Sequence, residues 1–222
     1  MCLILVAWQV HERLPLVVAA NRDEFHARPA SPADWWPDHP AVLAGRDLQA
    51  KGTWLGISRT GRFASVTNYR GGHDPGAAQS RGALVSGFLL GSTSPGVYVS
   101  EIEKAKNSYS GFNLLVADGR ELWWLSNRGD GARRLEPGCH ALGNLLLDSP
   151  EVLEVKERFE RTLASVEPLF SLLRTAKIVA PEYGTRCSTV VLKSGMGRTQ
   201  FAERPFDAAG TEGSTLRYEL AA

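Results

Sequence analysis

The sequence predicts an α+β protein in which helices pack on the outer faces of β-sheets. Three blocks of β-rich segments are separated by two pairs of helical segments, and no linker splits the chain. The 222 residues, of which 43% are hydrophobic and 22% charged, are enough for one domain with a substantial core. We therefore expect a single domain over residues 1–222.

The first block is expected to form two β-hairpins. These are residues 2–8 with 14–21, and residues 52–58 with 61–68. Between the hairpins, residues 28–40 contain four prolines and predict a long irregular loop. In such a loop Trp35 and Trp36 would form an exposed apolar lip.

The later segments follow in the same order along the chain. Helices are expected at residues 81–91, 94–108, 149–165 and 166–177. The third of these carries Val152, Val155, Phe159 and Leu163 at helical spacing. A meander of three strands is expected at residues 112–119, 121–129 and 132–144, and the terminal strands at 186–193, 199–206 and 214–220.

Charge and cysteine content exclude several classes of protein. Lys and Arg number 25 against 24 Asp and Glu, so the total charge gives no basic face for nucleic acid. Cys2, Cys139 and Cys187 are widely spaced and form no CxxC pair, so neither a disulfide framework nor a cysteine zinc site is expected. This cysteine usage fits a reducing compartment.

The apolar segment at the start of the chain lacks the pattern of a signal peptide. No basic region precedes it, and the charged residues of 11–13 interrupt it. No segment approaches the ~18 uncharged apolar residues that a membrane span needs. We expect a cytoplasmic protein with no membrane span.

Cys2 directly precedes an apolar run, and two interpretations of it are open. Cysteine is among the most buried residue types, so Cys2 could simply begin a core strand. Alternatively, Cys2 is a nucleophile whose thiol gives its proton to the chain's own α-amine after removal of Met1. An unperturbed α-amine has a pKa of ~8, close to that of a free thiol at ~8.5, and can serve as a base near neutral pH.

Other polar residues also lie at the ends of predicted strands. In Asn21–Arg22–Asp23, strand alternation should turn Arg22 away from whatever Asp23 faces. Asn68 and Asn144 could donate amide hydrogens to an oxyanion, although asparagines at strand ends are more often turn formers.

Arg186 lies at the start of a later strand and leaves two interpretations open. Its guanidinium could add positive charge near a thiolate. Taken alone, it is more often a surface charge.

Together these segments resemble a known family. The motifs NRDE, KGTWLGI, VTNYRG, SRG, GFNLLVAD, LGNLLLDSP and YGTRCSTVVL run in the family's order from Cys2 to about Val191. They resemble the NRDE family, also called the transport and Golgi organisation protein 2 family. That family is similar to cysteine-type N-terminal nucleophile hydrolases, which include bile salt hydrolases, penicillin V acylases and acid ceramidase-like amidases.

The resemblance implies a fold and a reaction. The fold would be the four-layer αββα sandwich of N-terminal nucleophile hydrolases. Cys2, after loss of Met1, would be nucleophile and base together, and Asp23 would contact the free amine and the substrate.

The resemblance also assigns the remaining candidate residues. Asn144 would match the oxyanion-hole asparagine, Asn68 the earlier asparagine of the site, and Arg186 the late arginine beside the thiol. Bile salt hydrolases keep an arginine three residues before the aspartate, where this sequence has Ala20.

Two functions are consistent with these residues. The first is hydrolysis of an amide or thioester of a small molecule by acyl transfer to Cys2, an amidohydrolase reaction on bonds other than peptide bonds. The alternative is a non-catalytic carrier or chaperone for haem or a lipid-like ligand on the same fold, since family members have been linked to haem trafficking and lipid metabolism. In both cases the expected partner is a small molecule, no cofactor is expected, and the oligomeric state is left open.

Overall fold

The computed structural model describes residues 2–163 and 165–221 and contains both helices and antiparallel sheets, which confirms the α+β class. The chain divides into two compact units. Unit 1 comprises Met1–Arg28, Pro137–Gly143 and Leu147–Ala222, and unit 2 comprises Pro29–Glu136 and Asn144–Leu146. No helix in the described part of the chain is both long and apolar enough to span a bilayer.

Unit 1 is built on an antiparallel six-stranded sheet. In spatial order its strands are β10 (Gly138–Leu142), β1 (Leu3–His11), β2 (Leu14–Phe25), β11 (Tyr183–Lys193), β12 (Thr199–Pro205) and β13 (Leu216–Leu220). β1 and β2 form the expected N-terminal hairpin, with Leu3 opposite Asn21. The three expected terminal strands are β11, β12 and β13.

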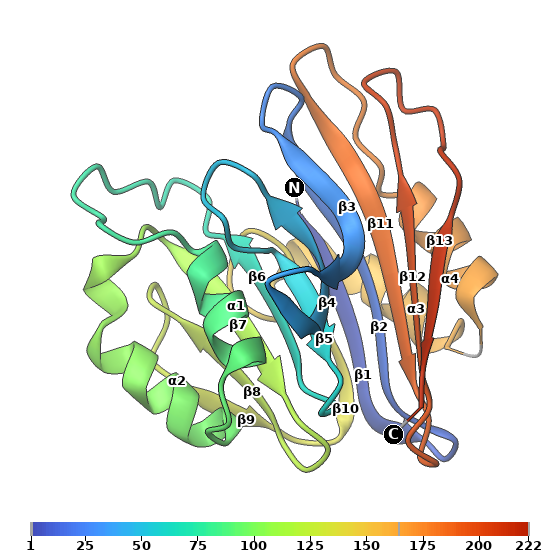
Figure 1. Cartoon of the computed structure of the whole chain (residues 1–222), viewed down its shortest axis with the longest axis horizontal. Coiled ribbons are helices and arrows are strands. Elements are labelled where there is room, and N and C mark those ends of the chain that lie inside the picture. Colours follow the sequence, from blue (N-terminus) through green and yellow to red (C-terminus); the bar gives the residue numbers. More distant parts are fainter. Residues whose placement is uncertain (1, 164, 222) are drawn as a thin grey trace. The chain divides into compact units, whose positions relative to one another are not determined.

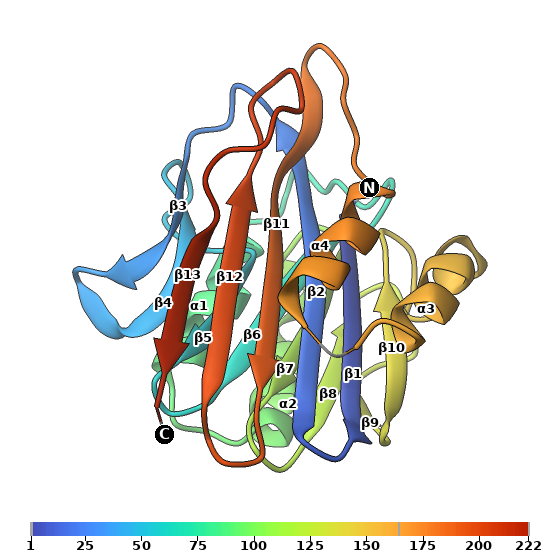
Figure 2. The ribbon, with the colours of Figure 1, turned by 90° about the vertical axis from the view of Figure 1, so that its right-hand side faces the viewer.

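Helices cover one face of this sheet. A 3₁₀ turn at Pro150–Val152 leads into α3 (Leu153–Glu160), and α4 (Val166–Arg174) follows; Figure 2 shows both helices against the sheet. Their apolar side chains form one core with alternate residues of the strands, including Leu5, Val17, Phe159, Leu169 and Val190. The intervening strand residues Val6, Val18 and Val191 are also buried, which explains why these strands read as continuous apolar runs.

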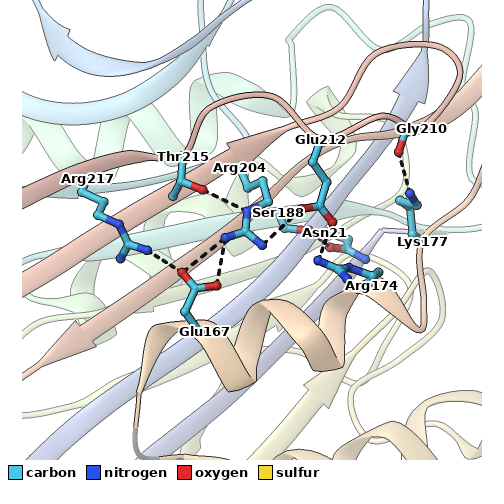
Figure 3. A network of polar contacts seen from close by, with 10 residues as sticks. All are labelled: Asn21, Glu167, Arg174, Lys177, Ser188, Arg204, Gly210, Glu212, Thr215 and Arg217. Carbon is cyan, nitrogen blue, oxygen red and sulfur yellow. Dashed lines mark hydrogen bonds and ion pairs between the residues drawn. The ribbon is translucent and has the colours of Figure 1, made fainter.

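Polar contacts also hold α4 in unit 1 (Figure 3). Arg204 of β12 pairs with Glu167 of α4 at 3.0 Å and stacks over the ring of Phe170 at 4.3 Å. At the other end of the helix, Asn21 of β2 donates to the Leu173 carbonyl at 2.9 Å. These contacts fix the segment that leads from α4 into the start of β11.

Unit 2 is built on an antiparallel seven-stranded sheet. Its strands lie in chain order: β3 (Ala30–Trp36), β4 (His39–Asp47), β5 (Leu55–Ser58), β6 (Phe63–Asn68), β7 (Phe112–Ala117), β8 (Leu122–Ser126) and β9 (Arg133–Leu135). The helices α1 (Gly82–Leu90) and α2 (Pro95–Lys104) lie against this sheet, followed by a 3₁₀ turn at Lys106–Ser108 (Figure 1). Phe88 and Val99 of the helices share a core with Ala64, Leu114 and Val116 of the sheet.

The expectation of an irregular loop at residues 28–40 is wrong. Most of this segment forms β3 and the start of β4. β3 is an edge strand, and its pairing with β4 shifts register between Ser31 and Asp34, around its one proline, Pro32, so the ladder tolerates the missing N–H group. Trp36 is buried and Trp35 stacks under the Arg59 guanidinium at 3.8 Å, so they form no exposed lip.

The strand expected at residues 132–144 is in fact two strands. Glu136–Pro137 interrupts it, because proline has no N–H to donate. β9 before this point joins the sheet of unit 2, whereas β10 after it pairs with β1 in unit 1.

Candidate functional site

Cys2 lies immediately before β1 and is partly buried. Its thiol contacts the main-chain carbonyl oxygen of Asp23 at 3.4 Å. Burial, together with the Asp23 carboxylate, raises the pKa of the Cys2 thiol to about 11. The thiol therefore holds its proton near neutral pH and needs a base to become a nucleophile.

Asp23 lies next to this thiol in β2, and its side chain is almost fully buried. Thr185 of β11, its partner in the strand pairing, donates its hydroxyl to Asp23 Oδ1 at 2.6 Å. Thr185 is itself fixed, because its hydroxyl accepts from the Ile178 N–H at 2.9 Å. Burial raises the pKa of Asp23, while the Thr185 hydrogen bond and the Arg22 charge oppose that rise.

Tyr183 belongs to the same group of residues, although the sequence analysis did not identify it. Its hydroxyl donates to the Asp23 carbonyl oxygen at 3.1 Å, the oxygen that the Cys2 thiol also contacts. The tyrosine oxygen and the sulfur are therefore within about 6.5 Å of each other. Burial, then the neighbouring Cys2 and Asp23, raise the pKa of Tyr183, so its hydroxyl remains a hydrogen-bond donor.

The charge of Arg22 also acts on this site, although its guanidinium pairs with Glu24 at 3.8 Å, on the side that strand alternation predicts. The pairing of β2 with β11 shifts register between Thr185 and Cys187, opposite Asp23 and Arg22. Arg22 is buried, and its positive charge lowers the pKa of both Cys2 and Asp23. A register shift of this kind is a β-bulge, and its extra residue lies in β11, opposite Asp23 and Arg22.

Arg186 is the residue at that register shift. Its Nη1 donates to the main-chain oxygen of His26 at 2.9 Å and lies 3.3 Å from His26 Nδ1. Arg186 therefore joins β11 to the turn after β2. The role beside the thiol that the family resemblance implies for it stays a prediction.

Asn68 and Asn144 lie together in unit 2. Asn144 Nδ2 donates to the Asn68 carbonyl at 2.7 Å, and the Asn144 carbonyl accepts from the Arg70 N–H at 2.7 Å. Asn113 of β7 donates to the Leu145 carbonyl at 2.9 Å. These bonds attach residues 144–146 to the end of β6, where Asn68 is exposed, and to the start of β7.

The three cysteines differ in their surroundings. All three are free thiols, and Cys187 is fully buried beside Glu203, so burial and then that carboxylate raise its pKa well above the usual value. Cys139 is partly buried, and burial raises its pKa to about 11. Of the three, only Cys2 can gain an adjacent free amine. Within residues 2–163 and 165–221, no group of three or more His, Cys, Asp or Glu side chains is placed to hold a metal ion.

The sequence and the fold were compared with those of known proteins. Residues 1–182 match the family described as Transport and Golgi organisation 2. The Transport and Golgi organization protein 2 homolog of Bos taurus is 33% identical over 236 residues, covering 85% of this chain and 86% of that protein.

Two solved structures share the fold. The Caenorhabditis elegans N-acylethanolamine-hydrolyzing acid amidase ortholog aligns with a TM-score of 0.61 at 12% identity, covering 86% of this chain and 92% of that one. The mutant C2A conjugated bile acid hydrolase of Clostridium perfringens aligns with a TM-score of 0.57 at 7% identity, covering 99% and 92%. At these identities the likeness concerns the fold alone, and it confirms that the fold resembles that of N-terminal nucleophile hydrolases, as the sequence predicted.

Proposed function

The chain belongs to the Transport and Golgi organisation 2 family, and we propose that it is a hydrolase that takes up an acyl group on Cys2 from an amide or thioester of a small molecule. The observation that carries the proposal is the contact of the Cys2 thiol with the Asp23 backbone at 3.4 Å, beside the buried Asp23 carboxylate and the Tyr183 hydroxyl. The hydrolase-type fold supports it.

The proposed reaction begins with removal of Met1, which lies outside the described residues. With a thiol pKa of about 11, only about one Cys2 in ten thousand would be ionised at pH 7. A free α-amine on the same residue lowers this obstacle, because it can take the proton as the thiol attacks, and the positive charge it gains favours the adjacent thiolate. The resulting ammonium would lie close to Asp23, and a positive neighbour stabilises a buried carboxylate.

The thiolate then attacks the substrate carbonyl carbon, forming a C–S bond and placing negative charge on the carbonyl oxygen. A donor close to the sulfur stabilises that oxyanion. The single hydrogen of the Tyr183 hydroxyl is donated to the Asp23 carbonyl oxygen, so Tyr183 can serve only by exchanging that bond for one to the oxyanion. The α-ammonium returns its proton to the leaving amine or thiol as the original bond breaks. Water then attacks the acyl-cysteine, which releases the carboxylic acid and restores the thiol.

A trapping experiment tests this proposal. Protein purified from cells is treated with a p-nitrophenyl ester of a short fatty acid, and the acyl adduct is located by intact mass and peptide mapping. We expect one acyl group per chain, on Cys2 of chains that lack Met1, followed by slow loss of the adduct through hydrolysis.

Two variants make the trapping result specific. Cys2→Ala should form no adduct, whereas Cys139→Ala, which removes another partly buried thiol, should label as the unmodified protein does. Labelling that persists in Cys2→Ala, or that occurs on chains still carrying Met1, would contradict the proposal.

A further inference from the structure

A pocket of about 500 Å³ lies in unit 2 at the end of the sheet where β6 begins. This volume is within the range of small-molecule sites. Its lining includes Arg62, Gly91, Ser92, Asp118, Gly119 and Arg120. Arg62 precedes β6 and Asn68 ends it, so the pocket is about 20 Å along the strand from the asparagine pair.

Arg62 gives this pocket a fixed positive group. Its side chain is only 7% exposed, and its guanidinium stacks on the Phe88 ring at 3.7 Å. Nε donates to the Phe88 carbonyl at 2.9 Å and Nη2 to the Thr93 carbonyl at 2.8 Å. For Nη1, the described residues provide no hydrogen-bond partner. Because stacking and two hydrogen bonds already hold the guanidinium, a ligand that binds its remaining edge need not order the side chain.

The charges lining the pocket favour an anion. Arg62 and Arg120 contribute two positive charges against the single carboxylate of Asp118. Asp118 Oδ1 already accepts hydrogen bonds from the Arg120 N–H at 2.7 Å and the Glu121 N–H at 3.0 Å. Burial lowers the pKa of Arg62, and the negative charge of Asp118 only partly opposes this effect. A second anion would therefore stabilise the buried guanidinium.

The shape and the donors narrow the class of anion. The Arg62 and Arg120 guanidinium groups come from two different turns, and Ser92 adds a hydroxyl from a third segment. A tetrahedral oxyanion can accept hydrogen bonds from several directions, whereas a planar carboxylate suits one paired donor edge. The volume also leaves room for an organic group attached to the oxyanion.

We propose that this pocket binds the phosphate group of an organic phosphomonoester, with Arg62 and Arg120 as its charged donors. The site is separate from Cys2 and does not depend on acyl transfer. The phosphomonoester could be a soluble molecule or the headgroup of a lipid, since both present the same terminal phosphate.

Titration of the full chain tests the proposal. Inorganic phosphate and glycerol 3-phosphate are added at constant ionic strength, with chloride as the balancing anion, while backbone amide signals are followed by NMR. We expect saturable shifts at Gly91 and Gly119. Arg120→Ala, which removes an exposed side chain, should weaken binding about tenfold. Arg128→Ala, which removes an exposed arginine in another turn of unit 2, should bind as the unmodified chain does.

Several outcomes would overturn the proposal. These are the absence of saturation, equal affinity in Arg120→Ala, shifts confined to other residues, or acetate binding as tightly as phosphate. Co-sedimentation with phosphatidylcholine vesicles containing phosphatidic acid distinguishes a lipid headgroup from a soluble phosphomonoester as the ligand. Binding to these vesicles but not to glycerol 3-phosphate would assign the site to a lipid, and the reverse would assign it to a soluble phosphomonoester.

Discussion

The polar groups around Cys2 in unit 1 and the asparagine pair in unit 2 are held in place differently. Around Cys2, buried side chains from neighbouring strands of one sheet contact each other, as Thr185 contacts Asp23 at 2.6 Å. In unit 2, Asn144 is held through main-chain groups of Asn68 and Arg70 at the exposed end of a strand. The first arrangement sets ionisation states through burial, whereas the second sets the position of a segment. Substitutions in the two groups should therefore have different effects.

The largest effect is expected at Asp23. Asp23→Asn keeps an acceptor for the Thr185 hydroxyl but removes the charge that would hold the α-ammonium of Cys2. We expect the rate of Cys2 acylation to fall about 1000-fold, within the range for groups that support proton transfer. Stopped-flow release of p-nitrophenolate measures the rate, with circular dichroism as the folding control. A rate within threefold of the unmodified protein would show that Asp23 has no part in the reaction.

Asn144 should have the next largest effect. If it donates to the oxyanion, as the family resemblance implies, Asn144→Ala lowers the acylation rate about 100-fold. The loss of its 2.7 Å hydrogen bond to Asn68 should cost only about 1 kcal/mol of stability. Urea unfolding and acylation kinetics on the same sample separate the two effects. An unchanged rate with reduced stability would restrict Asn144 to holding the segment.

Asp148 follows Asn144 by four residues and anchors the chain in unit 1. Burial raises its pKa, but hydrogen bonds from His140, the Ala141 N–H and Lys156 outweigh that effect and lower it to about 2. A carboxyl with a lowered folded-state pKa stabilises the fold above its unfolded pKa of ~3.9, and this stability is lost as the pH falls toward 2. Asp148→Asn should therefore lower the free energy of unfolding by about 2 kcal/mol at pH 7. Near pH 2 the variant and the unmodified protein should be equally stable.

Denaturant unfolding across pH 2–7 measures this effect. Glu154→Gln, in the exposed first turn of α3, makes the same change of charge without these contacts and serves as the control. A constant difference between Asp148→Asn and the unmodified protein at every pH would contradict the assignment to ionisation.

The smallest effect is expected at Arg22. Its charge lowers the pKa of the Cys2 thiol, so Arg22→Gln should shift the pH profile of Cys2 alkylation by iodoacetamide to higher pH. At neutral pH the reaction should become severalfold slower, because a smaller fraction of Cys2 thiols is ionised. Arg22→Lys keeps the charge and should restore most of the profile. Identical profiles for Arg22→Gln and the unmodified protein would remove Arg22 from the site.

The fold could be predicted wherever local pattern decides structure. The apolar runs around Val6 and Val18 predict the N-terminal hairpin because both faces of the sheet are buried there. The edge strand β3 escapes prediction because Pro32 within it and Pro29 and Pro37 beside it resemble a loop, and only its place at the edge of the sheet makes Pro32 acceptable. The segment 132–144 reads as one strand because nothing local shows that it divides between two sheets.

The candidate site could be predicted less completely. Cys2 and Asp23 stand out by their position at strand ends, and the structure places them in contact. Arg22 does not stand out, because it pairs with Glu24 as strand alternation predicts and acts on Cys2 and Asp23 only through its charge. Tyr183 carries no local signal, because its significance comes from sharing the Asp23 carbonyl with the thiol.

The central claim is that Cys2 carries a free α-amine in the active protein. Intact-mass spectrometry of the unmodified chain purified from cells tests it most directly, with N-terminal peptide sequencing to locate any difference. We predict a mass short by one methionine residue and a first peptide that begins with Cys2. A chain that keeps Met1 and is still acylated on Cys2 would contradict the account.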